Sequence, residues 1–218
     1  MDRAKQVLDQ WKRLNRNDPD LMAASGRLCL LQGKLFKAAL AMAPAKHKLP
    51  YDQIQDFRLQ LAELEQNYSR QAELLNQRIR STPSDDHAWS LLALSYWRMG
   101  KKEAAKGAAL KALALLDDTL SQNLTDAPLY RTRHSLVLAF VGRIEEAKAE
   151  LERTRSLPLC HFCEYGRCKD ADIIEAQIEE ILGNAENAQK LYTAGKANWP
   201  DDLDFVSGEA RLKKKGRK

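Results

Sequence analysis

Four glycines separate pairs of amphipathic segments along the chain, and their placement is the feature that most constrains the fold. Gly33, Gly100, Gly142 and Gly183 each lie between two stretches in which apolar residues recur every three or four positions. That spacing predicts helices with one buried face, and an intervening glycine predicts a reversal of direction. No window shows the alternation of apolar and polar residues that is typical of a strand. The sequence therefore predicts an all-α chain of antiparallel helix hairpins.

The clearest hairpin lies at residues 85–118. Its first half contains Trp89, Leu92, Ala93 and Tyr96, which follow the pattern W-x2-L-G-x2-Y with Ala in place of Gly. Small residues at fixed spacing follow the turn, namely Ala105, Ala109 and Ala112. Small side chains let two helices cross closely, and bulky neighbours fill the gaps beside them. This segment resembles the tetratricopeptide repeat (TPR) family. The resemblance implies a right-handed superhelical solenoid of about five hairpins, with terminal capping helices.

The remaining hairpins align on the same turn glycine. The intervals between the four glycines are 67, 42 and 41 residues, whereas the repeats of this family recur about every 34 residues. The first interval is close to two periods, so we expect a degenerate unit at 51–83 with a break near Asn67 and Tyr68. The predicted repeat array spans 20–200, with units at about 20–50, 51–83, 85–118, 128–159 and 170–200. Residues 1–19 are predicted to form an N-terminal capping helix or half repeat, and 201–218 a C-terminal capping helix, because repeat arrays need ends that cover the last apolar face.

The charge of the chain is concentrated at its C-terminal end. The net charge is +5, and six positive residues lie in the last eight, "RLKKKGRK", so the rest of the chain carries a net charge of −1. We interpret this basic tail, including Arg211, as a solvated helix end whose positive charges lie near the negative pole of the helix dipole. Acidic pairs such as Glu179–Glu180 are likewise interpreted as solvated ion pairs on helix faces.

No motif of a known catalytic or nucleotide-binding site occurs in the chain. The patterns G-x-x-x-x-G-K-[ST], G-x-G-x-x-G, H-E-x-x-H and G-x-S-x-G are all absent, so we predict that the protein is not an enzyme. The N-terminal sequence "MDRAKQVLDQWKRL" lacks the apolar core of a signal peptide. No apolar run approaches the roughly 20 residues of a membrane span. We expect a cytoplasmic protein without a membrane partner.

A cluster of cysteines raises the question of a metal site. Cys160, Cys163 and Cys168 lie in "LPLCHFCEYGRCKD", with His161 between the first two. Cys160 and Cys163 have the C-x2-C spacing that supplies two zinc ligands from one turn, and Cys168 could supply a third. The fourth ligand would come from His161, His134, Asp170 or a neighbouring helix, because no second C-x2-C exists.

Two other interpretations of these cysteines stay open. The neighbouring Arg167 and Lys169 favour a reactive thiolate, but the βαβ context of thioredoxin-like proteins is absent. The stretch also alternates apolar residues with turn formers, as a compact plug between hairpins would. We favour packing over zinc and zinc over redox chemistry, and we commit to no metal ligand and to no cofactor.

The family resemblance implies where a partner would bind. In this family the first helices of successive hairpins line a concave groove. By register, that groove is lined here by aromatic and basic side chains of the types that anchor protein interfaces. The predicted partner-binding residues are Arg27, His87, Trp97, Arg98, Arg133 and Phe140. We therefore predict a non-catalytic scaffold that binds a peptide or helix of another protein.

Two alternative functions remain. The basic tail and the groove arginines could serve a nucleic-acid-associated repeat protein, although the rest of the chain has no basic stripe. The chain could also be a regulatory module of a larger protein. The sequence predicts neither the partner nor the oligomeric state.

Overall fold

The computed structural model describes residues 6–11, 18–45, 47–122, 127–157 and 168–215. These residues form helices and turns, and no strand occurs among them. The predicted all-α helical-repeat class is confirmed. None of the described helices is both long enough and apolar enough to cross a membrane.

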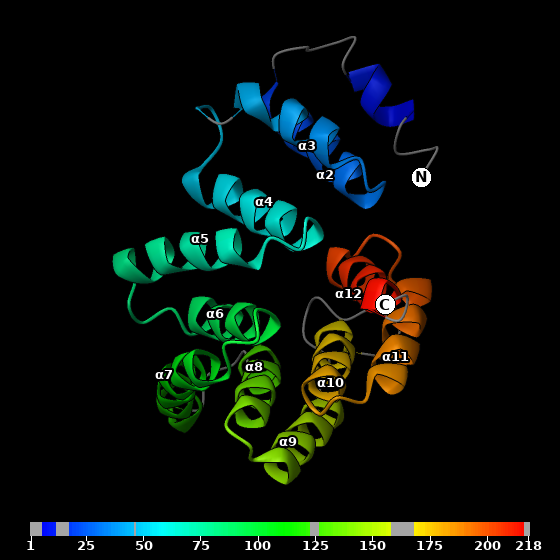
Figure 1. The fold of residues 1–218 in the computed structure, drawn as a ribbon. Coiled ribbons are helices and arrows are strands. Elements are labelled where there is room, and N and C mark those ends of the chain that lie inside the picture. Colours follow the sequence, from blue (N-terminus) through cyan, green and yellow to red (C-terminus); the bar gives the residue numbers. More distant parts are fainter. Residues whose placement is uncertain (1–5, 12–17, 46, 123–126, 158–167, 216–218) are drawn as a thin grey trace. The chain divides into compact units, whose positions relative to one another are not determined.

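The chain divides into two compact units, residues 1–67 and 68–218, which Figure 1 shows with their helices labelled. The boundary falls within the predicted unit 51–83. The first unit contains a helical segment at 6–11, followed by α2 (Pro19–Leu31), α3 (Leu35–Met42), the 3-10 turn η1 (Ala43–Ala45) and α4 (Tyr51–Leu64). The second contains α5 (Tyr68–Ser81), α6 (Asp86–Arg98), α7 (Lys102–Ser121), α8 (Ala127–Phe140), α9 (Ile144–Ser156), α10 (Lys169–Ile181), α11 (Ala185–Asn198) and α12 (Leu203–Lys215).

The turns after α2, α4, α6, α8 and α10 share one hydrogen-bonding pattern. A residue with positive φ donates its N–H to the carbonyl three residues earlier, and the next N–H donates to the carbonyl five residues earlier, at 2.8 to 3.1 Å. This Schellman arrangement satisfies the last carbonyls of the helix. Glycine occupies the left-handed position in four of the turns, and Gln66 occupies it in the fifth, with a φ of 56°. Gln66 lies 33 residues after Gly33 and 34 before Gly100, which matches the period of the family.

Replacing Gln66 with glycine should stabilise the protein. A side chain in the left-handed region costs about 1–2 kcal/mol, and glycine's greater unfolded-state entropy offsets part of the gain, so we expect an increase of about 0.5–1 kcal/mol in the free energy of unfolding. Urea denaturation measures the change.

Gly100→Ala is the matched control for Gln66→Gly. No atom lies within 4 Å of the position a Cβ would take at Gly100, whose φ is 77°. The control should therefore lose about 1 kcal/mol through backbone strain alone. A destabilised Gln66→Gly variant would contradict the turn geometry.

The first unit buries a small core beneath α3. Met42, Ala45, Leu49 and Ile54 form its centre, with Phe57 packed against them. Asp18 begins α2 by accepting a hydrogen bond from the N–H of Asp20, 2.9 Å away, as expected of an N-cap. Ala38 and Met42 of α3 are buried, whereas Phe36 and Leu40 on the same helix are exposed.

In the second unit, the helices of each pair cross on alanines. Ala105, Ala109 and Ala112 of α7 are fully or almost fully buried where α7 packs on α6. Ala147 of α9 and Ala188 of α11 are completely buried in their own pairs. The predicted small positions thus lie at helix crossings, where a larger side chain would separate the helices.

The end of the second unit packs through two glycines. A Cβ on Gly195 of α11 would lie 1.9 Å from the ring of Phe205, and one on Gly208 of α12 would lie 2.3 Å from the ring of Tyr192. Both aromatic rings are almost completely buried, and Phe205 also stacks on Trp199 with 5.6 Å between ring centroids. Each glycine therefore leaves room for an aromatic ring of the neighbouring helix.

Gly208→Ala should destabilise the second unit by about 1–3 kcal/mol, because the added methyl group overpacks a buried site. Gly107→Ala is the control, since nothing lies within 4 Å of its Cβ position in the helix α7 and alanine there should add about 0.5–1 kcal/mol. Thermal unfolding of both variants measures the difference. Equal effects at the two sites would contradict the packing of α11 on α12.

Candidate partner-binding site

The ends of four helices converge on one pocket in the second unit. The pocket has a volume of about 490 Å³, within the range of ligand-binding clefts. Its large apolar side chains come from the last turns of α6, α8, α10 and α12, and are Trp97, Phe140, Ile181 and Leu212. The rest of the lining consists of Lys102, Ala105, Glu180, Gly183 and Ala185.

Three of the apolar side chains at this pocket are accessible. Trp97, Phe140 and Ile181 are half-buried, whereas Leu212 and Glu180 are buried. Lys102, at the start of α7, is exposed and adds a positive charge to the pocket. The arrangement can accept a large apolar side chain and place a carboxylate or carbonyl near an ammonium group.

A buried ion pair supports the pocket. The guanidinium of Arg211 donates to both carboxylate oxygens of Glu180, at 3.0 and 2.6 Å, and the hydroxyl of Tyr192 donates to the same carboxylate at 3.1 Å. Burial alone would raise the pKa of Glu180, but the hydrogen bonds and charge of Arg211 outweigh it and lower the pKa below its ordinary value. Burial also raises the pKa of Tyr192. These contacts join α10, α11 and α12 beside Leu212.

Two sequence predictions about this pair are wrong. Arg211 was expected in a solvated basic tail, and Glu180 in a solvated ion pair, yet the side chains are only 4% and 3% exposed. The tail is further neutralised at Lys213, which donates to Glu209 at 2.7 Å. Glu209 also accepts from Lys196, and hydrogen bonds from these two lysines lower the pKa of Glu209 to about 2.

Four of the predicted groove residues, Arg27, His87, Arg98 and Arg133, are not among the residues that line the pocket. Arg133 of α8 pairs with Asp86 of α6 at 2.8 Å and lies over the ring of Tyr130. Near it, burial and then the charge of Arg133 lower the pKa of His87 to about 4, so the imidazole is neutral at pH 7. His87 and Trp97 are ten residues apart on α6, or roughly 15 Å along a helix.

Arg98 and Arg27 are the other two predicted groove residues that do not line the pocket. The Arg98 guanidinium lies over the ring of Tyr68, 5.5 Å from its centroid. Arg27 is exposed on α2, in the first unit. The structure therefore brings Trp97 and Phe140 together on one pocket and groups His87 with Arg133 in a separate polar cluster.

Sequence reasoning did not identify Lys102, Glu180 or Leu212 as pocket residues. Lys102 belongs to a second helix of a hairpin, which the groove model excludes, and Leu212 belongs to the capping helix, whose register the repeat pattern does not define. The sequence feature that could have identified Glu180 as a pocket residue is its position one before Ile181. Alignment of the hairpins on their turn glycines places Ile181 on the groove side of α10.

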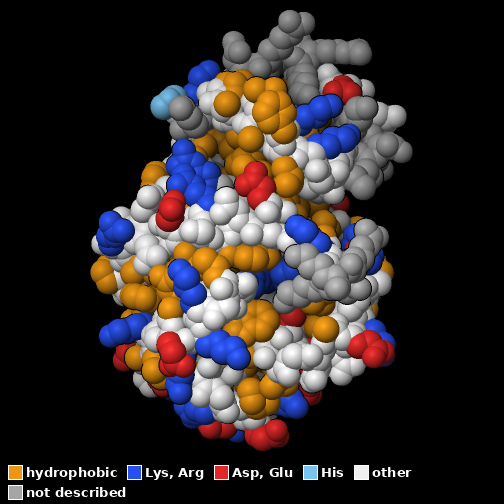
Figure 2. Space-filling model, viewed as in Figure 1, with side chains coloured by type: hydrophobic (Ala, Val, Ile, Leu, Met, Phe, Trp, Pro, Cys, Tyr) orange, Lys and Arg blue, Asp and Glu red, His pale blue; other side chains and the backbone are white. Residues whose placement is uncertain are grey.

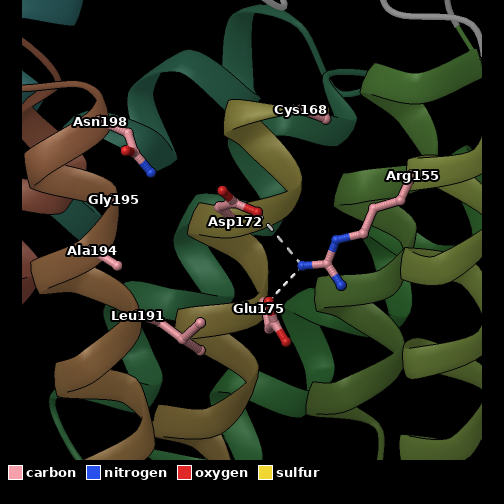
Figure 3. A pocket seen from close by; sticks show the side chains of 8 residues that line it. All are labelled: Arg155, Cys168, Asp172, Glu175, Leu191, Ala194, Gly195 and Asn198. Atoms are coloured by element: carbon pink, nitrogen blue, oxygen red, sulfur yellow. Dashed lines mark hydrogen bonds and ion pairs between the residues drawn. The ribbon is translucent and has the colours of Figure 1, made fainter. Parts of the chain in front are cut away.

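A second pocket lies between α9, α10 and α11 (Figure 3) and has a volume of about 430 Å³. Arg155 reaches from α9 toward Asp172 and Glu175 of α10. Cys168, at the start of α10, is a free, half-buried thiol that also lines this pocket. Across it, α11 contributes Leu191, Ala194, Gly195 and Asn198.

Of the three clustered cysteines, Cys168 lies among the described residues. Cys160, His161 and Cys163 lie outside the described residues. Among the residues that are described, no group of three His, Cys, Asp or Glu side chains is arranged to hold a metal ion. His134, one possible fourth ligand, instead lies 3.0 Å from a carboxylate oxygen of Asp117. Packing of Cys160, Cys163 and Cys168, which the sequence favours, and zinc binding by them both stay untested hypotheses.

Breaking the buried ion pair should destabilise the second unit strongly. Arg211→Met leaves the Glu180 carboxylate buried without its cation, which typically costs about 3–5 kcal/mol. The double variant Glu180→Leu/Arg211→Met should recover most of this loss, because well-packed apolar residues can replace a buried pair. Urea denaturation at neutral pH measures both. A loss below about 1 kcal/mol in the single variant would mean that the pair is solvated.

The comparisons with known proteins bear on the fold. No protein-family model matches the chain, and no curated protein matches it. Among solved structures, yeast Tom70 aligns over 97% of this chain and 43% of its own, with 16% identity and a TM-score of 0.50. The chain thus spans less than half of the Tom70 chain.

Two other solved structures are similar over most of this chain. YrrB, described as a TPR protein with an unusual peptide-binding site, aligns over 93% of this chain and 97% of its own, with 13% identity and a TM-score of 0.42. The Naa15/Naa10 complex bound to HypK-THB aligns over 97% of this chain and 31% of its own, with 17% identity and a TM-score of 0.36.

Proposed function

Because the chain has the fold of tetratricopeptide-repeat proteins, we propose that it is a non-catalytic scaffold that binds a peptide or helix of a partner protein at the pocket of Trp97 and Phe140. The observation that carries the proposal is the convergence of Trp97, Phe140 and Ile181 from three different helices on one cavity. Aromatic side chains in partly enclosed sites are the usual anchors of protein interfaces.

The chemistry of the pocket favours a particular kind of segment. Its accessible wall is apolar, and Lys102 supplies the exposed positive charge. Glu180, the one acidic group among the described residues of the lining, is neutralised by Arg211. A segment with a large apolar side chain next to an acidic residue, or ending in a carboxylate, fits this surface. Such a contact needs no catalytic group, which supports a scaffold over an enzyme.

A peptide selected on the protein tests the proposal. Peptides from a random library displayed on phage would be selected against the full chain, and their dissociation constants measured by fluorescence anisotropy. Trp97→Ala and Phe140→Ala should each weaken binding about tenfold or more, as expected for anchor residues. Lys102→Glu should weaken peptides that contain an acidic residue.

Leu110→Ala provides the matched control for the anchor variants. Leu110 is a large apolar residue of α7 that is 49% exposed and does not line the pocket. Its loss should leave the dissociation constants unchanged. Selected peptides that bind Trp97→Ala and Phe140→Ala as tightly as the wild type would overturn the proposed site, provided that thermal unfolding shows both variants to be folded.

A further inference from the structure

The helix α3 exposes large apolar side chains where the other hairpins expose polar or small ones. Phe36 is 81% exposed and Leu40 is 63% exposed. They lie four residues apart, so they are neighbours on one side of the helix. The opposite side carries Ala38 and Met42, which are buried in the core of the first unit. An eight-residue helix that is apolar on both sides leaves one of them without a partner.

The chain itself provides the comparison that makes Phe36 unusual. Three residues after the left-handed turn residue, the later helices α5, α7, α9 and α11 carry Ser69, Glu103, Glu145 and Glu186. Seven residues after it, they carry Glu73, Gly107, Ala149 and Lys190. All eight of these residues are exposed. The repeat architecture thus places this position in solvent, and only α3 fills it with an aromatic ring.

The segment of sequence that contains α3 is positively charged. Residues 21–51 contain no Asp or Glu, and their five basic residues are Arg27, Lys34, Lys37, Lys46 and Lys48. Lys34 and Lys37 are exposed beside Phe36. Lys34 donates to the neutral side chain of Gln32 at 2.7 Å, and neither lysine forms an ion pair within the described part of the chain. Figure 2 shows hydrophobic side chains on this unit, with Lys and Arg beside them and a few Asp or Glu side chains nearby.

We propose that the exposed side of α3, formed by Phe36, Leu40, Lys34 and Lys37, binds an acidic amphipathic segment of a partner protein. Charge complementarity carries this assignment, because 31 consecutive residues supply cations and no carboxylate. The partner's Glu or Asp residues pair with Lys34 and Lys37, while its apolar side chains cover Phe36 and Leu40. Exposed apolar patches rimmed by charge are typical of such contacts.

The dimensions of the surface favour a peptide over a membrane or a nucleic acid. Interfacial membrane helices present a long apolar face to the bilayer, whereas α3 has eight residues and exposes two large apolar ones. Binding of RNA relies on cations and stacked rings, which would leave the adjacent Leu40 without a function. Two apolar residues one helical turn apart match the spacing on a partner helix.

A labelled amphipathic helix of about 18 residues (five turns), with Leu on one side and Glu on its flanks, is the probe. Its twin carries Lys in place of Glu. Fluorescence anisotropy should detect binding of the acidic peptide to the full chain, weakening as salt rises from about 0.05 to about 0.5 M. The basic twin should not bind. Equal binding of the two peptides, or no binding of the acidic one up to about 1 mM, would overturn the proposal.

Variants assign the binding to α3. Phe36→Ser places at α3 the residue that α5 carries at the equivalent position, and Lys37→Gln removes one charge. Each should weaken binding about tenfold. Leu110→Ser, which removes an exposed leucine of α7 that does not line the pocket of the second unit, should leave it unchanged. Weaker binding in the Leu110 variant would contradict the assignment. Unchanged binding in the Phe36 variant would contradict it as well.

Parallel assays address the other possible occupants. Vesicles of phosphatidylserine and phosphatidylcholine, or a single-stranded RNA oligonucleotide, could bind more tightly than the peptide and lose binding in Phe36→Ser. That result would assign the surface to a membrane or to RNA and overturn the protein partner. Sedimentation could reveal a dimer that is lost in Phe36→Ser. That result would assign the surface to a second copy of this chain and would also overturn the proposed partner protein.

Discussion

The left-handed residue that ends the first helix of each pair is the constraint on which the rest of the structure depends. A helix that stops there leaves its last carbonyls satisfied by the turn itself, so the next helix can begin within two residues without a side-chain cap. Lys34, Lys101 and Arg143 all precede second helices without such a cap. Since the turn is identical each time, the position of every later residue relative to it is also repeated.

This repetition explains why much of the fold follows from the sequence. Helical periodicity and turn glycines are local signals, and the alanines at the crossings recur at fixed distances from them. Even the turn without a glycine, at Gln66, was predicted near Asn67 from spacing alone. In contrast, the pairing of Glu180 with Arg211 joins residues 31 positions apart. It depends on how α12 packs on α10 and α11, which no local pattern encodes.

The candidate site was predictable to a similar extent. Register along the first helices identifies Trp97 and Phe140 as residues on the same side of the array. It does not distinguish residues at one end of a helix from residues at the other end. A helix rises about 1.5 Å per residue, so His87 and Trp97 lie at opposite ends of α6. The pocket also needs Leu212 from the capping helix, whose position is set by the buried ion pair and by the close contact of Gly208 with Tyr192. Long-range packing therefore decides which of the predicted residues share a site.

A repeated framework also changes how unusual residues should be interpreted. The same structural position occurs in all five hairpins. The residues that four hairpins carry there show what the fold requires, and a different residue in the fifth hairpin indicates a requirement other than folding. At the exposed position three residues after the turn, the fold accepts Ser69 or glutamate and needs no apolar group. Phe36 contributes almost nothing to the core because it is 81% exposed. An aromatic ring that is both unnecessary for folding and unfavourable in water is best explained by a contact outside the unit, and the carboxylate-free sequence around it indicates the charge of that contact.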